Sequence, residues 1–493
     1  MPTSDPLQSC PDALKVRCRT LNERDPNPEA DYVLCWLQQA LRGRDNPALD
    51  VAIALANARS LPVLVYHGIG MAYPHASDRL HRFLLGASAM LRRQCKERGL
   101  ACVNFLQRPD KVEKGLVYRL AKRAALVVTD DQPTFVGRWQ ADRFSAGTER
   151  LVVAVDANRL VPYQALPEDL GSTRAFRAAA KALREDYGEP DDIAPEHPPY
   201  DGPVCFEPDD PTAWSDAEVD ALIRACPIDH SLPPGAFEAS RAAIDTRLDR
   251  LKREVLPVYK YRRNNPADPN SASHLSPYLH FGMIGPREIF QIVQRADAPA
   301  GCKWKYLDEL LTWREWFWYL ADGRSHPASY DNVPAAARAS LNAHRHDPRP
   351  ALYDLAQLTR GETDDPIWNA AQRQYLLDGY MHNNLRMYWV KQIIKWTPDP
   401  ETAWATACHL NDRLSYDGRD PATYGNMEWG FGRSRPYAER PVYGTVPYKT
   451  DRALRKRPGV MEWVEAMNAR PLPDVAIPDL AERASMYGVE LDE

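Results

Sequence analysis

The sequence predicts two folded parts, a doubly wound α/β domain over residues 1–185 and an all-α domain over residues 216–493. Three observations support this fold class. Short apolar runs alternate with helical patterns in about the first 160 residues, a stretch rich in proline and acidic residues follows, and helical periodicity dominates the remainder. The chain of 493 residues is also too long for one hydrophobic core, which favours more than one domain.

Five apolar runs in the first part are expected to be β-strands. They are Tyr32–Trp36 ("YVLCW"), Leu61–Tyr66 ("LPVLVY"), Ala101–Leu106 ("ACVNFL"), Ala125–Thr129 ("ALVVT") and Leu151–Val155 ("LVVAV"). Runs of this length between helical segments are typical of parallel strands that are buried on both faces. Neither G-x-G-x-x-G nor G-x-x-x-x-G-K-[ST] occurs in this part, so the Rossmann-like sheet is expected without the usual dinucleotide or triphosphate loop.

Residues 186–215, "DYGEPDDIAPEHPPYDGPVCFEPDDPTAWS", are too polar and too often interrupted by proline to form a core element. We interpret them as an interdomain linker on the surface. Beyond them the helical segments are "DAEVDALIRAC", "EASRAAIDTRLDRLKREVLPVYKY", "KYLDELLTWREWFWYLAD", "DDPIWNAAQRQYLLDGYMHNNLRMYWVKQIIKW" and "PETAWATACHL".

Composition excludes several classes of protein. A net charge of −5 argues against coating nucleic acid by bulk electrostatics, so any such binding needs a local basic patch. The first 20 residues lack the apolar core of a signal peptide, and no apolar run approaches a membrane span. The nine cysteines are scattered without a C-x-x-C pair, which argues against a zinc ribbon or a clustered iron–sulfur site. We therefore expect a cytoplasmic monomer with buried free thiols and no metal.

Tryptophan is unevenly distributed, since ten of the 13 residues lie in the helical part. In "LRMYWVKQIIKW", Trp389 and Trp396 lie two helical turns apart on about the same face, roughly 10 Å along the axis. Trp368 belongs to the preceding predicted helix and could lie between them. Lys391 and Lys395 are cationic neighbours. Core packing is the simpler explanation of each ring, and a path for electrons is the alternative.

Two further segments carry groups that suit an anionic, hydrogen-bonding ligand. In "SASHLSPYLHFG", Ser273 and Ser276 precede a proline at a predicted helix start, where hydroxyl and N–H groups either cap the helix or bind phosphate. In "LNDRLSYDGRDP", Asn411, Asp417, Arg419 and Asp420 supply an amide, two carboxylates and a guanidinium. An ordinary surface loop is the alternative for the second segment.

The segment "DELLTWREWFWYL" combines a carboxylate with aromatic rings. Glu309 and Trp313 are four residues apart and therefore share one face of a predicted helix, with Arg314 next to them. This combination suits a planar, base-like ligand, whereas plain core packing explains the tryptophans equally well.

Six blocks in order along the chain resemble the photolyase/cryptochrome family, and most closely its class II cyclobutane pyrimidine dimer photolyases. They are "RGRDNPALDVAIALANA", "YKYRRNNPADPNSASHLSPYLHFG", "DPIWNAAQ", "MHNNLRMYWVKQIIKW", "LNDRLSYDGRDP" and "AERPVYG". The resemblance extends from about residue 15 to 450.

The resemblance implies a noncovalent FAD inside the helical domain. Positions that match cofactor contacts are Tyr259, Arg263, Ser273, Leu275, Ser276, Arg314, Asn383, Arg386, Asp417, Gly418 and Arg419. Asn411 matches the amide that faces flavin N5. Trp389, Trp368 and Trp396 match the photoreduction chain from its inner to its outer end, and we expect the nearby lysines to keep the outer end hydrated.

The resemblance also implies a pocket for a flipped pyrimidine dimer, lined by Glu309, Trp313, Met387 and Trp429. Glu309 would hydrogen-bond a thymine carbonyl edge and stabilise the radical anion. Phosphate contacts are expected from the basic stretch "GRSRPYAERPVYGTVPYKTDRALRKR", in which we single out Arg433, Arg435 and Arg440. A solvated charged surface is the alternative for this stretch.

The implied function is light-dependent DNA repair, in which photoexcited reduced FAD donates an electron to a flipped-out dimer in UV-damaged DNA and the cyclobutane ring splits. The sequence departs from class II at "GFGRSRPYAER", "GTVPY" and "MHNN", changes that touch DNA handling more than FAD binding. The alternatives are a cryptochrome-like FAD photoreceptor, a helical protein whose tryptophans are core, and a repair enzyme for (6-4) lesions. The last normally uses a histidine pair, and His382 stands alone. The sequence leaves open an antenna chromophore such as a deazaflavin or folate.

Overall fold

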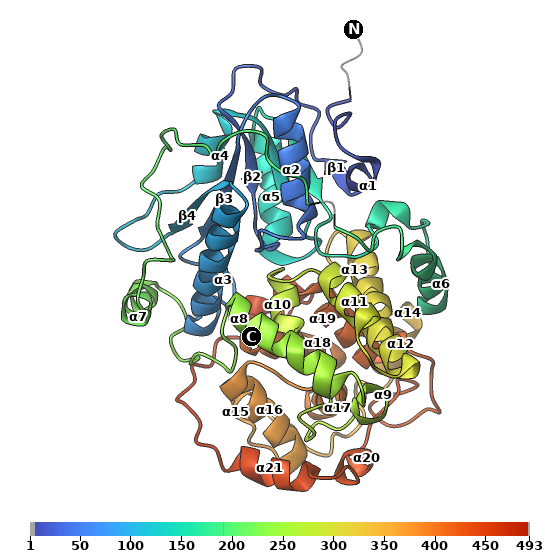
Figure 1. Cartoon of the computed structure of the whole chain (residues 1–493). Coiled ribbons are helices and arrows are strands. Elements are labelled where there is room, and N and C mark those ends of the chain that lie inside the picture. Colours follow the sequence, from blue (N-terminus) through green and yellow to red (C-terminus); the bar gives the residue numbers. More distant parts are fainter. Residues whose placement is uncertain (1–4, 191, 492–493) are drawn as a thin grey trace.

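The computed structural model describes residues 5–190 and 192–491. Figure 1 shows a region built on a β-sheet above a larger helical region, with the long helix α3 (Asp78–Glu97) reaching from one to the other. The predicted ranges 1–185, 186–215 and 216–493 include residues 1–4, 191 and 492–493, which lie outside the described residues.

The sheet has the strand order β1-β6-β5-β2-β3-β4. Its strands are β1 (Cys18–Thr20), β2 (Tyr32–Trp36), β3 (Val63–Ile69), β4 (Ala101–Leu106), β5 (Ala124–Asp130) and β6 (Val152–Val155). All pairs are parallel except β1 with β6. The predicted parallel strands and the Rossmann-like fold are therefore confirmed. The sequence analysis missed β1, because three residues on a sheet edge carry too little pattern.

Alternate side chains of each strand enter different cores, as the pleat of a strand requires. On β2, Val33 and Cys35 face one core, while Tyr32, Leu34 and Trp36 face the other. Helices α2 (Pro47–Asn57) and α3 cover the first face, and α4 (Leu116–Ala121) and α5 (Phe135–Gly147) cover the second. Burial on both faces explains why the strands read as continuous apolar runs.

The carboxyl ends of β2 and β5 meet where the strand order changes direction. The Asp130 carboxylate at the end of β5 accepts hydrogen bonds from the backbone N–H groups of Gln38, Gln39 and Ala40, at 2.7, 2.9 and 3.0 Å. These bonds fix the loop after β2. In open α/β sheets this is the place where ligands bind.

The remaining helices follow in chain order. Around the sheet lie α1 (Asp12–Lys15), the 3₁₀ turn η1 (Tyr163–Ala165), α6 (Thr173–Leu183) and α7 (Asp216–Ala225). The helical region contains α8 (Arg241–Arg250), α9 (Tyr259–Arg262), α10 (Ser276–His280), α11 (Pro286–Arg295), α12 (Ala300–Asp308), α13 (Glu315–Asp322), α14 (Ala335–Ala343), α15 (Leu355–Arg360), α16 (Pro366–Asp378), α17 (Asn383–Trp396), α18 (Pro400–Leu414), α19 (Pro421–Glu428), α20 (Arg452–Arg455), α21 (Val460–Asn468) and α22 (Ala481–Ala484). It also contains the π-helical turns η2 (Leu251–Val255), η3 (Glu309–Arg314) and η5 (Trp429–Arg433) and the 3₁₀ turns η4 (Tyr330–Asn332) and η6 (Ser485–Tyr487).

Two helices pack across the predicted domain division (Figure 1). Phe176 of α6 lies against Trp316 and Tyr319 of α13, so α6 packs on the helical region. Helix α7 instead packs on α3, where Ile223 and Leu85 share an apolar cluster. The two regions are thus joined by exchanged helices as well as by the chain itself.

The described part of the chain contains neither a helix suited to cross a membrane nor a cluster of metal-ligating side chains. No helix within residues 5–190 and 192–491 is long and apolar enough to cross a membrane. Over the same residues, no group of three or more His, Cys, Asp and Glu side chains is arranged to hold a metal ion.

Buried histidines should make the fold sensitive to acid. Burial lowers the pKa of several histidines, to about 4 for His67, His81 and His274 and to about 3 for His382 and His409. Because these pKa values lie below the unfolded value of about 6.5, the unfolded chain binds more protons. Stability is therefore lost as pH falls through this window, by roughly 1–2 kcal/mol per histidine at pH 5.

We expect the urea midpoint of unfolding to fall steadily between pH 7 and pH 5. His382→Asn is the matched variant. The His382 side chain accepts a bond from the N–H of Asn384 as the N-cap of α17, and asparagine preserves that cap without titrating. The variant should lose less stability over the same interval. A midpoint that does not change between pH 7 and pH 5 would contradict the prediction.

Candidate functional site

A polar cavity of about 210 Å³ lies between α10, α17 and α19 in the helical region. It is lined by Ser276, Leu279, His280, Arg314, Tyr380, Met381, Asn383, Arg386, Asp417, Asp420, Ala422, Thr423 and Asn426. Five of these, namely Ser276, Arg314, Asn383, Arg386 and Asp417, are predicted cofactor residues. The structure therefore brings together side chains that are up to 141 positions apart in the sequence (417 − 276).

An ion pair forms one wall of this cavity. Arg386 Nη2 lies 3.1 Å from Asp417 Oδ1, and Asp417 also accepts hydrogen bonds from Ser415 and Ser276. Burial opposes ionisation of Asp417, but the charge of Arg386 and these bonds outweigh it and hold its pKa below the usual range. Both partners are therefore charged around neutral pH.

Donors without a protein partner identify what the cavity can hold. Arg386 Nε and Arg314 Nη2 are buried and have no hydrogen-bond partner within the described residues. Guanidinium groups prefer carboxylate and phosphate oxygens. The donor set therefore fits an anionic cofactor. Because ligand sites usually measure about 300–1,000 Å³, a cavity of about 210 Å³ would hold only part of a dinucleotide.

Three further cofactor candidates lie outside that lining and form a second cluster. The rings of Tyr259 and Tyr306 pack edge to face at 5.0 Å, and the Tyr306 hydroxyl donates to Ser273 Oγ at 2.9 Å. Arg263 Nη2 pairs with Glu309 Oε1 at 2.5 Å. This cluster suits the outer portion of a long ligand.

The structure does not bring every predicted cofactor residue to the cavity. The Arg419 guanidinium donates to the backbone carbonyls of Asp412, Ser415 and Tyr416 at the end of α18. A side chain at Gly418 would lie only 2.7 Å from the carbonyl oxygen of Asn411, so glycine is required there for packing.

Leu275 and Asn411 are also removed from the cavity lining. Leu275 is buried as the N-cap residue of α10, and Asn411 is buried within α18. Asn411 Oδ1 accepts a hydrogen bond of 2.8 Å from the Tyr375 hydroxyl. A direct contact between Asn411 and a cofactor is therefore not indicated by this lining.

Sequence reasoning missed several lining residues, of which His280 is the clearest, whereas it singled out Asp420 without matching it to a cofactor contact. His280 Nδ1 lies 3.2 Å from Asp420 Oδ2, and Trp318 Nε1 donates to Asp420 Oδ1 at 3.2 Å. Burial opposes the charge of Asp420, but the bond with His280 and the charge of Arg314 outweigh it and lower its pKa. Asp420 belongs to the "DGRDP" segment, whose charged residues indicated a ligand site in the sequence.

Three tryptophans form a continuous row through the helical core. Trp389 and Trp368 stack with ring centroids 6.2 Å apart and an interplanar angle of 4°, and Trp368 meets Trp396 edge to face at 5.5 Å. Trp368 on α16 thus lies between the two rings of α17, as the sequence suggested. Trp396 is 5 % exposed and contacts Tyr353.

Tyr375 joins this row to the cavity, and the sequence analysis missed it. Its ring lies 5.8 Å from that of Trp389, and the Arg386 guanidinium lies 5.4 Å from the ring centre. Tyr375 follows Trp368 by seven residues on α16. The two side chains therefore share one helix face, which was a readable signal.

The structure corrects the expected role of Lys391. We expected Lys391 and Lys395 to hydrate the outer ring, but Lys391 is 6 % exposed and its ammonium donates to the carbonyl oxygen of Gly430. Burial, with the charge of Lys449, lowers its pKa to about 7. Lys395 alone meets the expectation, with its ammonium 5.9 Å from the Trp396 ring.

The two tryptophans predicted to line the dimer pocket lie in separate π-helical turns. Trp313 belongs to η3 and Trp429 to η5, and their rings meet edge to face at 5.0 Å. π-Helical turns are rare and are frequent at functional sites. Residues 309–314 form a π-helical turn instead of the expected α-helical one, and residues four apart still lie on about the same face of such a turn. Met387 is half-buried on α17.

Glu309 is held between two cations. Its carboxylate pairs with Arg263 at 2.5 Å and with Lys305 at 2.6 Å, and its side chain is 24 % exposed. The carboxylate therefore has a fixed orientation and access to solvent.

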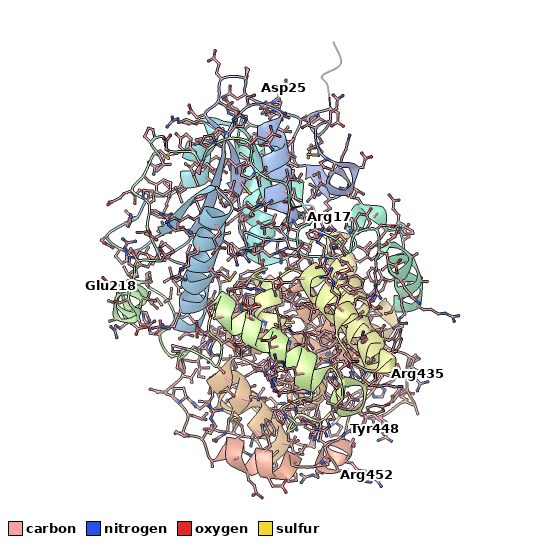
Figure 2. The ribbon with its side chains drawn as sticks, in the orientation of Figure 1. Arg17, Asp25, Glu218, Arg435, Tyr448 and Arg452 are labelled. Carbon is pink, nitrogen blue, oxygen red and sulfur yellow. The ribbon has the colours of Figure 1, made fainter. Side chains whose placement is uncertain are left out.

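The three predicted DNA-contacting arginines differ in their surroundings. Arg433 pairs with the buried Glu428 at 2.5 Å and donates to the carbonyl of Asn332, so it is held inward. Arg435 and Arg440 are exposed, and Arg440 stacks on Tyr448 at 3.9 Å. Figure 2 shows Arg435, Tyr448 and Arg452 along one side of the helical region.

A second cleft, of about 140 Å³, opens at the carboxyl ends of β2 and β3. Trp36, His67 and Phe135 line it from the sheet region, and His280 and Arg419 line it from the helical region. Its walls are mostly aromatic and apolar. The cleft lies at the change of strand direction described above.

A parallel sheet coupled to a helical cavity and a tryptophan row defines a class of two-domain proteins built around an internal anionic cofactor. Sequence comparisons give the family. A sequence model of DNA photolyase matches residues 33–199. The deoxyribodipyrimidine photo-lyase of Methanothermobacter thermautotrophicus is 30% identical over 451 residues, covering 91% of this chain and 97% of the relative. The enzyme of the same name from Arabidopsis thaliana is 30% identical and covers 88% of each chain.

Solved structures share the fold. A class III photolyase from Agrobacterium tumefaciens superposes with a TM-score of 0.61 at 20% identity, covering 89% of this chain and 86% of that one. A Synechocystis cryptochrome gives a TM-score of 0.61 at 18% identity, covering 95% of both chains. The chain belongs to the photolyase/cryptochrome family, and its relatives over most of its length are enzymes of the photo-lyase class. Membership of the family implies FAD as the cofactor.

Proposed function

We propose that this protein is a light-dependent DNA repair enzyme that splits cyclobutane pyrimidine dimers. The observation that carries the proposal is the row Trp396–Trp368–Trp389, which continues through Tyr375 to the polar cavity. Stacked core aromatics alone would not need to end beside a buried guanidinium whose Nε lacks a hydrogen-bond partner among the described residues. The names of the curated relatives support the same substrate.

The cavity residues would hold FAD. Arg386 and Asp417, with Ser276 and Asn383, offer charge and hydrogen bonds on one side, while Arg314 does so on the other. Bound there, reduced FAD supplies the light-driven electron transfer that splits the dimer. The row of tryptophans would carry electrons inward from the surface.

Residues beside the cavity would receive the lesion. Trp313 and Trp429 offer an aromatic wall for two extruded, linked pyrimidines, and extrusion costs a few kcal/mol, least for damaged bases. Glu309, fixed by Arg263 and Lys305, would accept a hydrogen bond from the N3–H beside a pyrimidine carbonyl and so position the lesion. The exposed Arg435 and Arg440 would contact phosphates of the DNA backbone.

Glu309→Gln should lower the repair yield several-fold while FAD content stays unchanged. The amide keeps the size of the side chain but replaces the ionised acceptor of the pyrimidine N3–H with a weaker, neutral one. The yield per absorbed photon on UV-irradiated oligothymidine measures the effect, and flavin absorbance per chain is the control. Glu254→Gln, an exposed carboxylate on η2, is the matched variant. A wild-type yield would remove Glu309 from this role.

One preparation tests the function as a whole. An absorption spectrum should show bound flavin, and illumination with UV-irradiated oligothymidine should restore the absorption of the intact bases. A colourless chain after reconstitution, or illumination without recovery, would overturn the proposal.

A cryptochrome-like photoreceptor is the second candidate. It is favoured by Arg433, which is tied to Glu428 and would have to release it before contacting DNA. Normal photoreduction without repair would select this alternative.

We further propose that the cleft at the sheet edge holds an antenna chromophore. Trp36 and Phe135 supply aromatic walls for a planar ring, and the family includes an archaeal photolyase described with two FAD molecules. Deazaflavin, folate and flavin would be separated by the absorption spectrum of the released chromophore.

A further inference from the structure

A third hollow, of about 730 Å³, lies on the junction of the two regions and belongs neither to the proposed FAD cavity nor to the sheet-edge cleft. Four segments enclose it: the loop 72–76 before α3, the segment 227–231, helix α18, and the C-terminal segment 476–483. Figure 1 shows the C-terminal segment returning from α21 toward this junction. Among the described residues, the lining of this hollow shares only Ala72 and Tyr73 with the lining of the sheet-edge cleft.

Buried polar atoms face this hollow without partners. His409 is 1 % exposed, and neither Nδ1 nor Nε2 has a hydrogen-bond partner within residues 5–190 and 192–491. Arg413, one helical turn later on α18, is 3 % exposed, and its Nη1 is likewise unpartnered in the described chain. Buried groups of this kind normally have a partner, because leaving one unpaired costs about 1–3 kcal/mol.

The hollow is also cationic. Arg413 is paired with Asp229 at 2.7 Å, whereas Arg483 lines the hollow and makes no ion pair with any described residue. Burial, together with the charges of Arg413 and Arg483, lowers the pKa of His409 to about 3. The ring is therefore neutral around pH 7 and offers one donor and one acceptor.

The remaining walls are apolar and suit a ring system. Tyr73, Pro74, Ile228 and Ile477 line the hollow beside the polar groups. A volume of about 730 Å³ far exceeds that of a single inorganic anion and lies within the usual range for small-molecule sites of about 300–1,000 Å³. The hollow therefore combines cationic side chains that can bind an anion with apolar walls that can contact a planar ring attached to that anion.

We propose that this hollow binds a nucleoside phosphate, with Arg413, Arg483 and His409 contacting the phosphate. Guanidinium groups bind phosphate oxygens through charge-assisted hydrogen bonds. The apolar walls would contact the base. Because the four enclosing segments come from both regions, an occupant would also tie the C-terminal segment to the sheet region.

Titration calorimetry on the full chain carrying its flavin tests the proposal with AMP, inorganic phosphate and adenosine as probes. AMP should bind once per chain without releasing flavin. Phosphate should bind at least about tenfold more weakly, and adenosine should not bind measurably. Failure of AMP to bind would overturn the proposal, and phosphate binding as tightly as AMP would overturn the nucleoside assignment.

Variants locate the binding. Arg483→Gln should weaken AMP binding about tenfold or more, whereas Arg224→Gln, which removes an exposed charge from α7, should leave it unchanged. His409→Phe should weaken AMP binding while the melting temperature stays equal or rises, because an apolar ring replaces unpaired polar atoms. AMP affinity that is unchanged in both Arg483→Gln and His409→Phe would place any binding elsewhere and overturn the proposal.

Discussion

Photoreduction of the bound flavin should fall about a hundredfold in Trp389→Phe, equivalent to ~2.7 kcal/mol in the barrier. Trp389 is fully buried and stacks on Trp368 at 6.2 Å, so it is the innermost ring of the row. Phenylalanine fills most of the same space but is far harder to oxidise than an indole. The row would be interrupted while the core stays packed.

Two comparisons separate electron transfer from damage to the fold. Trp404→Phe is the matched control, because Trp404 is equally buried but contacts Tyr330 and Phe431 instead of the row. Its photoreduction rate should remain close to that of the wild type. Trp389→Phe that has been reduced chemically should still repair dimers. Unchanged photoreduction in Trp389→Phe would remove this residue from the path.

Arg386→Met should abolish stable FAD binding. Arg386 is 6 % exposed and pairs with Asp417 at the cavity wall. Its removal deletes a buried donor and leaves the Asp417 carboxylate without its counter-charge, a change that typically costs about 3–5 kcal/mol. Flavin absorbance per chain after gel filtration measures the loss.

The double variant Arg386→Met/Asp417→Asn distinguishes cofactor binding from stability. Asparagine removes the stranded charge, so the melting temperature should recover much of the loss, because neutralising both partners avoids an uncompensated ion. Flavin content should not recover, since the guanidinium is still absent. Recovery of flavin together with stability would show that Arg386 acts only on the fold.

The sequence predicted the features that depend on local pattern. Continuous apolar runs gave the buried strands such as Tyr32–Trp36, because both faces of a covered parallel sheet exclude water. The seven-residue spacing of Trp389 and Trp396 predicted their common helix face, and Trp368 indeed lies between them. The six motifs in their order along the chain predicted membership of the photolyase/cryptochrome family.

Other features depended on where the chain folds back on itself. Nothing around Lys391 in the sequence shows that Gly430, 39 positions later, provides the carbonyl that receives its ammonium. Arg433 likewise appeared to be a surface cation, but Glu428 is buried and draws it inward. The partner of Lys391 is far away in the sequence, and the partner of Arg433 becomes buried only when the chain packs.

The sequence by itself determined the two-part architecture, the parallel strands, the common helix face of Trp389 and Trp396 and the family, since each follows from periodicity or from ordered motifs. Only the tertiary structure decided which charged groups face a cavity and which pair with one another. It also revealed the junction hollow around His409, to which four separate segments contribute. The physical reason is that burial and electrostatic pairing are properties of positions in space, and a linear pattern records only neighbours along the chain.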